Sequence, residues 1–570
     1  MAFSAGRIAM KATEADIKIQ EAIDHRASFL LDAGAGSGKT TSLIRALNYI
    51  RSSKRQELIA NSQRVACITF TNVAKNEIVE RTEGDPLFIV STIHDFLWGA
   101  IKPFQNELKS AVIRLNGQLS STSRKKRDPL ELSDSLKRID SISYSDRGGN
   151  FLEGRIFHDD LLSVAYIMFS EHPMLARLVA ARYPFIFVDE YQDTNGKVIS
   201  LLLDYVSKVK LPPVVGFFGD KMQSIYSDGV GELSEAHKAS LVSIKKEENY
   251  RSSISVINVL NKIRSDIQQR PSGKNLLGAA VYLNLSSSNV DDIVMKAKSL
   301  VAESFGWASN EDDTRILFLT HRLIARKAGY GELWRTYNQR GGFLQDQFQA
   351  GEDETSRFLC NEIDDLIYLW KQGDVGSVIS LLNLAKTIVA SKNEKRRVHG
   401  ALDSLVRTAE LGTIRDVVRY VEENRLAVLP DRLREHLMSS DILKGEANEE
   451  EDKDKQFYES LLAVPFKEVA TYHAVLQNNL PYSTKHGVKG DEFRTVLVIL
   501  DDIGANWSQY SFSNLLANSD TSQDRLRRTR NLFYVSCSRA KEKLAIVDVG
   551  APKNSQSVKD LFGEGNCIFA

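Results

Sequence analysis

The sequence FLLDAGAGSGKT at residues 29–40 decides the fold. Its apolar beginning predicts a short strand, and its glycine-rich end predicts a turn followed by a helix that runs to Tyr49. In such a turn, backbone N–H groups point inward around phosphate oxygens, and the helix N-terminus adds a positive dipole end. Lys39 supplies a charge for the β and γ phosphates, and the Thr40 hydroxyl suits Mg²⁺. We expect a phosphate-binding loop made by Ala33, Gly34, Ala35, Gly36, Ser37, Gly38, Lys39, Thr40 and Thr41.

A second stretch, FIFVDEYQDT at residues 185–194, indicates what happens to the nucleotide. An apolar strand delivers Asp189 at its carboxyl end, where it can hold Mg²⁺ beside the phosphates. The adjacent Glu190 can orient or deprotonate a water for attack on the γ phosphate. Paired acids beside a phosphate loop therefore predict hydrolysis to water, and they disfavour a phosphate-loop kinase.

Apolar and β-branched runs that alternate with helical stretches predict the fold class. The runs lie at residues 27–32, 64–69, 185–189, 214–218, 315–319, 494–500 and 544–548. Near-continuous apolar strands between amphipathic helices are typical of parallel sheets covered on both faces. We expect an α/β protein with one parallel sheet in each half and helical insertions in both.

Composition limits the function classes. The 570 residues are 42% hydrophobic and 26% charged, which is typical of globular proteins. Lys and Arg together number 74, and so do Asp and Glu, so any nucleic-acid contact must use a local groove. Neither an export signal nor a membrane-spanning stretch is readable, so we expect a cytoplasmic protein. The four cysteines have no CxxC spacing, which argues against a zinc or iron–sulfur site.

With these motifs in order, the sequence resembles the UvrD/Rep-like helicases of superfamily one. Four further segments of the first half match the family: TFTN at 69–72, STIHDF at 91–96, GDKMQSIY at 219–226 and ENYRS at 248–252. In the second half, TKHGVKGDEF at 484–493 and RNLFYVSCSRA at 530–540 match its later motifs.

The resemblance implies roles for individual residues. The catalytic group would be Lys39, Asp189, Glu190, Gln223, Arg251 and Arg539, with Thr40 and Asp189 on Mg²⁺. Gln20, Tyr250, Arg251, Glu492 and Arg539 would join the phosphate loop in binding ATP. Single-stranded or partly duplex DNA would meet Thr71, Asn72, His94, Phe96, Tyr226 and His486. Either core packing or base stacking explains the aromatic residues, and His486 is equally open to an interior role.

The resemblance also implies two RecA-like domains of a P-loop NTPase. The first would comprise residues 1–96 and 156–260, interrupted by a helical insertion at 97–155. The second would comprise 261–328 and 480–570, interrupted by a larger helical insertion at 329–479. Arg539 would reach the triphosphate when the domains close, and repeated closure would drive movement on DNA, with 3′ to 5′ direction implied by the family.

The sequence departs from the family after Tyr226, where Ser227-Asp228-Gly229 replaces the usual aromatic, arginine and glycine. This change removes one stacking ring and one cation. Two functions therefore stay open: an autonomous helicase, or a DNA-sensing ATPase subunit of an anti-phage complex. The second is favoured by similarity to the helicase-like subunit of Gabija-type defence systems, and it implies an OLD-family nuclease as partner.

Overall fold

The computed structural model divides the chain into two compact units. Unit 1 comprises Met1–Gly278 and Arg530–Ser538, and unit 2 comprises Ala279–Thr529 and Arg539–Ala570. The structure describes residues 12–121, 123, 125–145, 149–224, 229–285, 290–307, 314–319, 321–351, 353–385, 387, 391–438, 449–477, 482–483, 491–502, 510–549 and 554–569.

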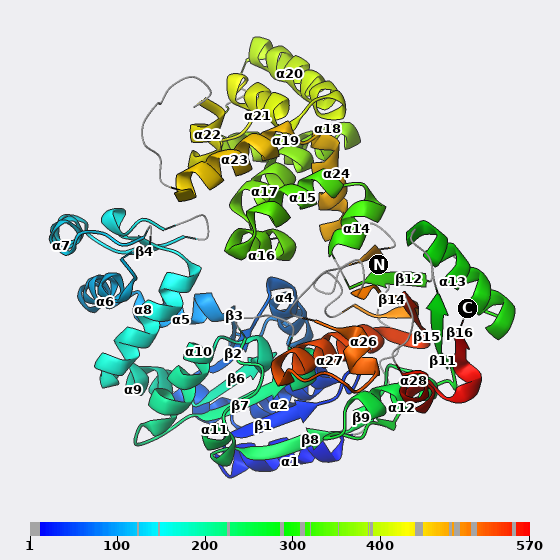
Figure 1. Ribbon diagram of the computed structural model, residues 1–570. Coiled ribbons are helices and arrows are strands. Elements are labelled where there is room, and N and C mark those ends of the chain that lie inside the picture. The colour runs from blue at the N-terminus through cyan, green and yellow to red at the C-terminus, as the bar shows by residue number, and fades with distance from the viewer. Residues whose placement is uncertain are drawn as a thin grey trace. The chain divides into compact units, whose positions relative to one another are not determined.

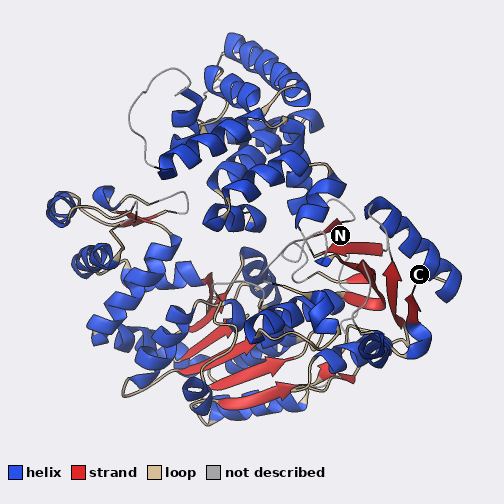
Figure 2. Cartoon of the chain, in the orientation of Figure 1, coloured by secondary structure: helices blue, strands red, loops and turns tan. Residues whose placement is uncertain are grey.

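Unit 1 is built on a six-stranded parallel sheet with strand order β3-β2-β6-β7-β1-β8 (Figures 1 and 2). Its strands are β1 (Phe29–Ala33), β2 (Val65–Thr69), β3 (Phe88–Thr92), β6 (Phe185–Asp189), β7 (Val214–Gly219) and β8 (Val242–Lys246). The short pair β9 (Glu248–Asn249) and β10 (Arg270–Pro271) follows it.

Side chains of this sheet alternate between two apolar cores. Leu31 packs in one core with the helices α1, α2, α3 and α4, whereas its neighbour Leu30 packs in the other with α5, α6, α8, α9 and α10. Both residues are buried, which explains the uninterrupted apolar pattern of the strand. The helices are α1 (Glu14–Asp24), α2 (Lys39–Ser53), α3 (Arg55–Ala60), α4 (Asn72–Arg81), α5 (Ile93–Ile101), α6 (Gln105–Gln118), α8 (His158–Glu171), α9 (Pro173–Arg182) and α10 (Gly196–Ser200).

Three phenylalanines join the central strands of this sheet beneath the candidate site. Phe29, Phe187 and Phe218 make edge-to-face contacts with ring centroids 5.5–5.9 Å apart. Gly216 makes room for them, because a Cβ there would lie 2.5 Å from the Phe29 ring. The close packing gives the site a rigid floor.

The remaining elements of unit 1 lie in its inserted segment or follow the sheet. The inserted segment contains α7 (Pro129–Arg138), β4 (Ser143–Tyr144) and β5 (Arg155–Ile156), with β4 and β5 paired in parallel. The expected boundary at residue 97 falls inside α5, which packs against the sheet. Further elements are α11 (Glu235–Ala239) and α12 (Ile254–Ile263).

Unit 2 contains a second parallel sheet with strand order β13-β12-β14-β15-β11-β16. Its strands are β11 (Ala279–Leu285), β12 (Thr314–Phe318), β13 (Tyr482–Ser483), β14 (Phe493–Leu500), β15 (Ala540–Val549) and β16 (Cys567–Phe569). Unit 2 also contains α13 (Val290–Phe305), α14 (His321–Ala328), α26 (Phe512–Leu516) and α28 (Ser555–Phe562). Helix α27 (Gln523–Cys537) is shared, because its second half groups with unit 1.

Between β12 and β13 the described residues form helices. They are α15 (Gly331–Arg340), α16 (Gly342–Ala350), α17 (Glu354–Phe358), α18 (Asp365–Gln372), α19 (Val375–Leu384), α20 (Lys392–Leu411), α21 (Ile414–Glu423), α22 (Asp431–Met438), α23 (Glu449–Ala463) and α24 (Phe466–Leu476). Their apolar faces share one core with the sheet of unit 2.

The two parallel sheets confirm the predicted α/β class. Every expected run overlaps a strand, whereas five strands of the two sheets, β3, β8, β11, β13 and β16, were not among those runs. Within the described residues, no helix combines the length and apolar character needed to cross a membrane.

Candidate nucleotide-binding site

The glycine-rich loop connects β1 to α2 at the carboxyl edge of the first sheet (Figure 1). Gly36 and Gly38 have φ values of 73° and 78°, in the left-handed region that favours glycine. A Cβ at Gly36 would lie 2.7 Å from the Arg251 Cβ and 2.9 Å from the Asn249 Oδ1. The loop thus needs glycine for both conformation and space.

Three side chains fix the peptide groups on either side of Ala35. Its N–H donates to the Tyr534 hydroxyl at 3.1 Å. Its carbonyl accepts from the Asn249 amide at 3.0 Å and from the Gln269 amide at 2.7 Å. These contacts hold a glycine-flanked loop in one shape.

Two groups of the loop and helix α2 suit a phosphate ligand. The Ser37 hydroxyl is buried and has no hydrogen-bond partner among the residues that the structure describes. Lys39 and Thr40 form the first turn of α2, where backbone N–H groups and the helix dipole favour anions. The residues of the loop and of the first turn of α2 therefore suit a nucleoside triphosphate.

The acidic pair closes strand β6 beside this loop. The Glu190 carboxylate accepts hydrogen bonds from the Lys39 ammonium and, at 2.6 Å, from the Gln192 amide. Glu190 has φ 52°, a left-handed conformation that is uncommon for a side chain of its size and is a feature of functional turns. Its N–H donates to the Asp189 carboxylate at 3.0 Å.

Charges in this cluster shift one another's pKa. Burial raises the pKa of Asp189 to about 7, and Lys39 opposes that rise while Glu190 adds to it. Burial alone would lower the pKa of Lys39, but Glu190 and Asp189 outweigh it, so the pKa is raised. Lys39 is therefore a firmly charged ammonium, as phosphate binding requires.

A chain of amide contacts extends from Glu190 to Gln223. The Gln192 side-chain oxygen Oε1 accepts from the Asp220 N–H at 3.1 Å, while the side-chain Nε2 donates to Glu190. The Gln223 amide in turn donates to the Asp220 carboxylate at 2.9 Å. Gln192 therefore connects the end of β6 with the segment that follows β7.

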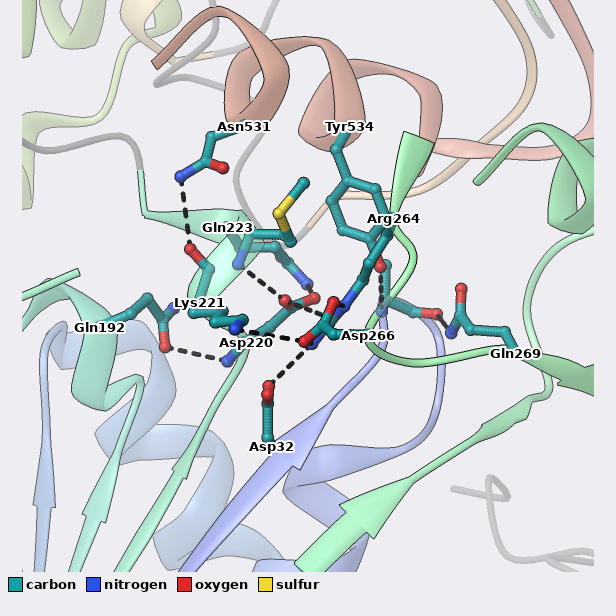
Figure 3. Close-up of polar contacts among 12 residues, drawn as sticks. Asp32, Gln192, Asp220, Lys221, Gln223, Arg264, Asp266, Gln269, Asn531 and Tyr534 are labelled. Carbon is teal, nitrogen blue, oxygen red and sulfur yellow. Dashed lines mark hydrogen bonds and ion pairs between the residues drawn. The ribbon is translucent and has the colours of Figure 1, made fainter. Parts of the chain in front are cut away.

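A fully buried arginine at the end of α12 organises the carboxylates beneath the site (Figure 3). The Arg264 guanidinium pairs with Asp32 at 3.0 Å, with Asp220 at 2.8 Å and with Asp266 at 2.9 Å. Burial would raise the pKa of Asp266, but its hydrogen bond with Arg264 lowers it to about 2. Burial raises the pKa of Asp32 to about 6 against the pull of Arg264. The sequence did not predict a role for Arg264, because the neighbouring residues in the chain match no motif.

The remaining nucleotide candidates of unit 1 lie at three places. The Tyr250 N–H donates to the Gly36 carbonyl at 2.9 Å, so Tyr250 is adjacent to the loop. The Arg251 guanidinium donates to the Ser538 carbonyl at 3.3 Å. Gln20 is half-buried on α1, whose Asp16 accepts from the Ser42 hydroxyl of α2 at 2.5 Å.

Four predicted DNA contacts follow the neighbouring strands β2 and β3. Thr71 and Asn72 are exposed at the start of α4, where the Thr71 hydroxyl accepts from a backbone N–H. His94 is half-buried in the first turn of α5. Phe96 is 6% exposed and packs against Tyr183 with ring centroids 5.7 Å apart, so it belongs to the core. The predicted contacts Tyr226 and His486 lie outside the described residues.

His94 is part of a half-buried aromatic cluster. Its ring lies 4.4 Å from that of His158 and is nearly parallel to that of Tyr144, with centroids 6.4 Å apart. Tyr144 and His158 share a hydrogen bond of 2.5 Å, and Trp98 lies 5.9 Å from Tyr144. Burial and the neighbouring His158 lower the pKa of His94 to about 4, so the ring is neutral at neutral pH.

Two predicted nucleotide contacts belong to unit 2. Arg539 is buried before β15, and its guanidinium donates to the Asp491 carbonyl at 3.3 Å. Glu492 pairs with Lys541 at 3.2 Å. Unit 1 therefore brings together Lys39, Thr40, Asp189, Glu190, Gln223, Tyr250 and Arg251, whereas Arg539 and Glu492 lie in the second unit.

The chain is similar to several characterised proteins. Residues 16–228 match a family described as an AAA domain. The Gabija protein GajB of Bacillus cereus (strain HuB5-5) is 26% identical, with 96% of each chain covered. The ATP-dependent DNA helicase PcrA of Staphylococcus aureus (strain Mu50) is 24% identical over 91% of this chain and 80% of PcrA. PcrA of Bacillus subtilis (strain 168) is 28% identical over 43% of this chain and 38% of PcrA.

Proposed function

We propose that this chain, which is similar to GajB and to PcrA over most of its length, is a helicase-like ATPase of the UvrD type that hydrolyses Mg²⁺-bound ATP to move on single-stranded DNA in the 3′ to 5′ direction. One observation carries the proposal: the Glu190 carboxylate lies against the Lys39 ammonium, at the junction of strand β6 and the glycine-rich loop. In the proposed site, an acid that could activate water would therefore lie beside the group that would bind the γ phosphate.

In the proposed cycle, each group at this junction has a separate task. Lys39 leaves Glu190 for the phosphates, which frees the carboxylate to orient the attacking water. Thr40 and Asp189 would hold Mg²⁺, which would neutralise charge on the phosphate oxygens. Gln223 senses the γ phosphate, and its bond to Asp220 holds it ready.

Two arginines complete the proposed site. Arg251 follows the loop-contacting Tyr250, and Arg539 follows Ser538, whose carbonyl Arg251 contacts. An arginine suits charge that develops during phosphoryl transfer because its planar fork stays protonated. Because Arg539 belongs to unit 2, its engagement would make hydrolysis depend on closure of the two units.

The surface proposed for DNA begins at the ends of β2 and β3. Thr71 and Asn72 present polar groups there, and His94 starts the next helix. Beyond His94, the half-exposed rings of Tyr144 and His158 offer faces on which single-stranded bases could stack. Such contacts do not depend on the base sequence of the DNA, which suits a protein that moves along DNA.

An ATPase assay with and without single-stranded DNA tests this function. We expect DNA to raise the rate of the wild-type chain, and Lys39→Ala to abolish hydrolysis in both conditions. Lys18→Ala, which changes an exposed lysine of α1, is the matched control and should behave as wild type. An ATPase rate of the wild-type chain that is the same with and without single-stranded DNA would contradict autonomous motor function.

A second function is favoured by the similarity to GajB over 96% of each chain. In this alternative, binding of ATP and DNA to the chain controls the activity of a partner nuclease of the OLD family in an anti-phage complex. Co-purification of such a nuclease with the chain from its native host would support the alternative. Full strand separation by the chain alone, without a stable partner, would oppose it.

A further inference from the structure

Helix α27 reaches the nucleotide site with two side chains of its second half. Arg530–Ser538 group with unit 1, whereas the first half of the same helix belongs to unit 2. Asn531 and Tyr534 are three residues apart, so they lie on the same face of the helix. In Figure 3 both descend from this helix, Asn531 toward the Lys221 backbone and Tyr534 toward Arg264.

Tyr534 acts on the phosphate loop. Its hydroxyl accepts the Ala35 N–H at 3.1 Å. The flanking Gly34 and Gly36 give this loop more conformational freedom than other residues would. A fixed partner for the Ala35 N–H removes part of that freedom before any nucleotide arrives.

Asn531 acts on the segment that contains Gln223. Its amide donates to the Lys221 carbonyl at 3.3 Å and to the Ser224 carbonyl at 3.2 Å, on either side of Gln223. The Gln223 side chain is held separately by Asp220. The backbone and the side chain of this segment are therefore anchored by different elements.

We propose that Tyr534 and Asn531 are positioning residues through which helix α27 sets the shapes of the phosphate loop and of the Gln223 segment together. The inference rests on the proposed ATPase function. A loop already in its binding shape loses less conformational entropy when phosphates arrive, so Tyr534 contributes to nucleotide affinity. A fixed Gln223 segment contributes to turnover, because Gln223 is there to respond to the γ phosphate.

Tyr534→Phe tests the first half of the proposal. The substitution keeps the buried ring and removes the hydroxyl alone. In a titration with fluorescent ATP in the absence of DNA, we expect about fivefold weaker binding, the effect of one lost hydrogen bond. Tyr472→Phe removes a comparable buried bond, from the Tyr472 hydroxyl to the Phe348 carbonyl in unit 2, and should bind as wild type. Equal affinity in wild type and Tyr534→Phe, or equal weakening in both variants, would overturn the role of Tyr534.

Asn531→Ala tests the second half. We expect a lower kcat for ATP hydrolysis with an unchanged KM, since the phosphate loop keeps its own anchor. An unchanged kcat, or a rise in KM alone, would overturn the role of Asn531. Failure of DNA stimulation in the wild type would contradict the motor function but would leave the Tyr534 affinity test in force, because that test uses no DNA.

Discussion

Glu190 lies between two donors, the Lys39 ammonium and the Gln192 amide, in a backbone conformation that directs it toward the glycine-rich loop. In the proposed mechanism, its negative charge activates the water that attacks ATP. Glu190→Gln should therefore reduce kcat by roughly 100-fold or more while ATP binding persists. Glu153→Gln, at an exposed site of unit 1, is the control. Hydrolysis by Glu190→Gln at the wild-type rate would exclude Glu190 as the activating group.

His94 predicts a dependence of stability on pH. Its pKa is about 4 in the folded chain, below the ordinary value of 6.5, because burial and His158 disfavour the charged ring. Between these values the unfolded chain binds more protons, so stability is lost as pH falls from 6.5 toward 4. The other groups against this ring are Asp95, which favours the charged form, and Tyr144.

His94→Gln should weaken this dependence. Urea unfolding midpoints at pH 7 and pH 5 measure it: the fall between them should be smaller in His94→Gln than in wild type. The exposed substitution His25→Gln should leave the fall unchanged. An identical fall in His94→Gln and wild type would show that His94 carries no part of it.

Local motifs predicted the candidate nucleotide-binding residues but not the residues that support them. Lys39 and the Asp189-Glu190 pair stand in short sequence patterns whose chemistry is readable. Arg264 pairs with Asp220 and Asp32, which lie 44 and 232 positions away in the sequence. Only the folded chain brings these residues together, so no local motif could predict the role of Arg264. An aspartate inside an apolar strand, Asp32, was the available signal that a buried cation must lie nearby.

The cluster of Arg264 with Asp32, Asp220 and Asp266 joins the end of α12, strand β1 and the segment after β7. Arg264→Met keeps an unbranched side chain but removes the guanidinium, which leaves Asp32 and Asp220 without their cation. Loss of one partner of a buried ion pair costs roughly 3–5 kcal/mol, and urea unfolding should show a fall of this order in the free energy of unfolding. The free energy of unfolding of Arg264→Lys should lie between those of wild type and Arg264→Met, since a lysine keeps the charge without the planar fork. Arg155→Met, at an exposed pair with Glu153, should be close to wild type. A small effect of Arg264→Met would mean that the cluster does not hold these elements together.

Strand prediction followed burial for most strands, although β11, which is buried along almost all of its length, was also missed. Fully buried strands such as β2, β6 and β7 were found because both faces are apolar. Strand β8 was missed because it lies at the sheet edge, where Val242, Ser243 and Lys245 are exposed and its sequence reads as polar. Strand β3 ends in Ser91 and Thr92, and its apolar run is too short to stand out.

The two units, each with its own parallel sheet, are connected at three points of the chain: after Gly278, within helix α27 after Thr529, and after Ser538. Similarity to GajB and to PcrA extends across both units. The second half of this shared helix contacts the Gln223 segment through Asn531 and the phosphate loop through Tyr534.

The most direct test of movement is stopped-flow translocation on single-stranded DNA of increasing length with a fluorophore at the 5′ end. If ATP turnover drives 3′ to 5′ movement, the time of the fluorescence change will increase linearly with DNA length, and Lys39→Ala will show no such change. An ATP-dependent signal that is independent of DNA length, from a chain that hydrolyses ATP normally, would contradict translocation.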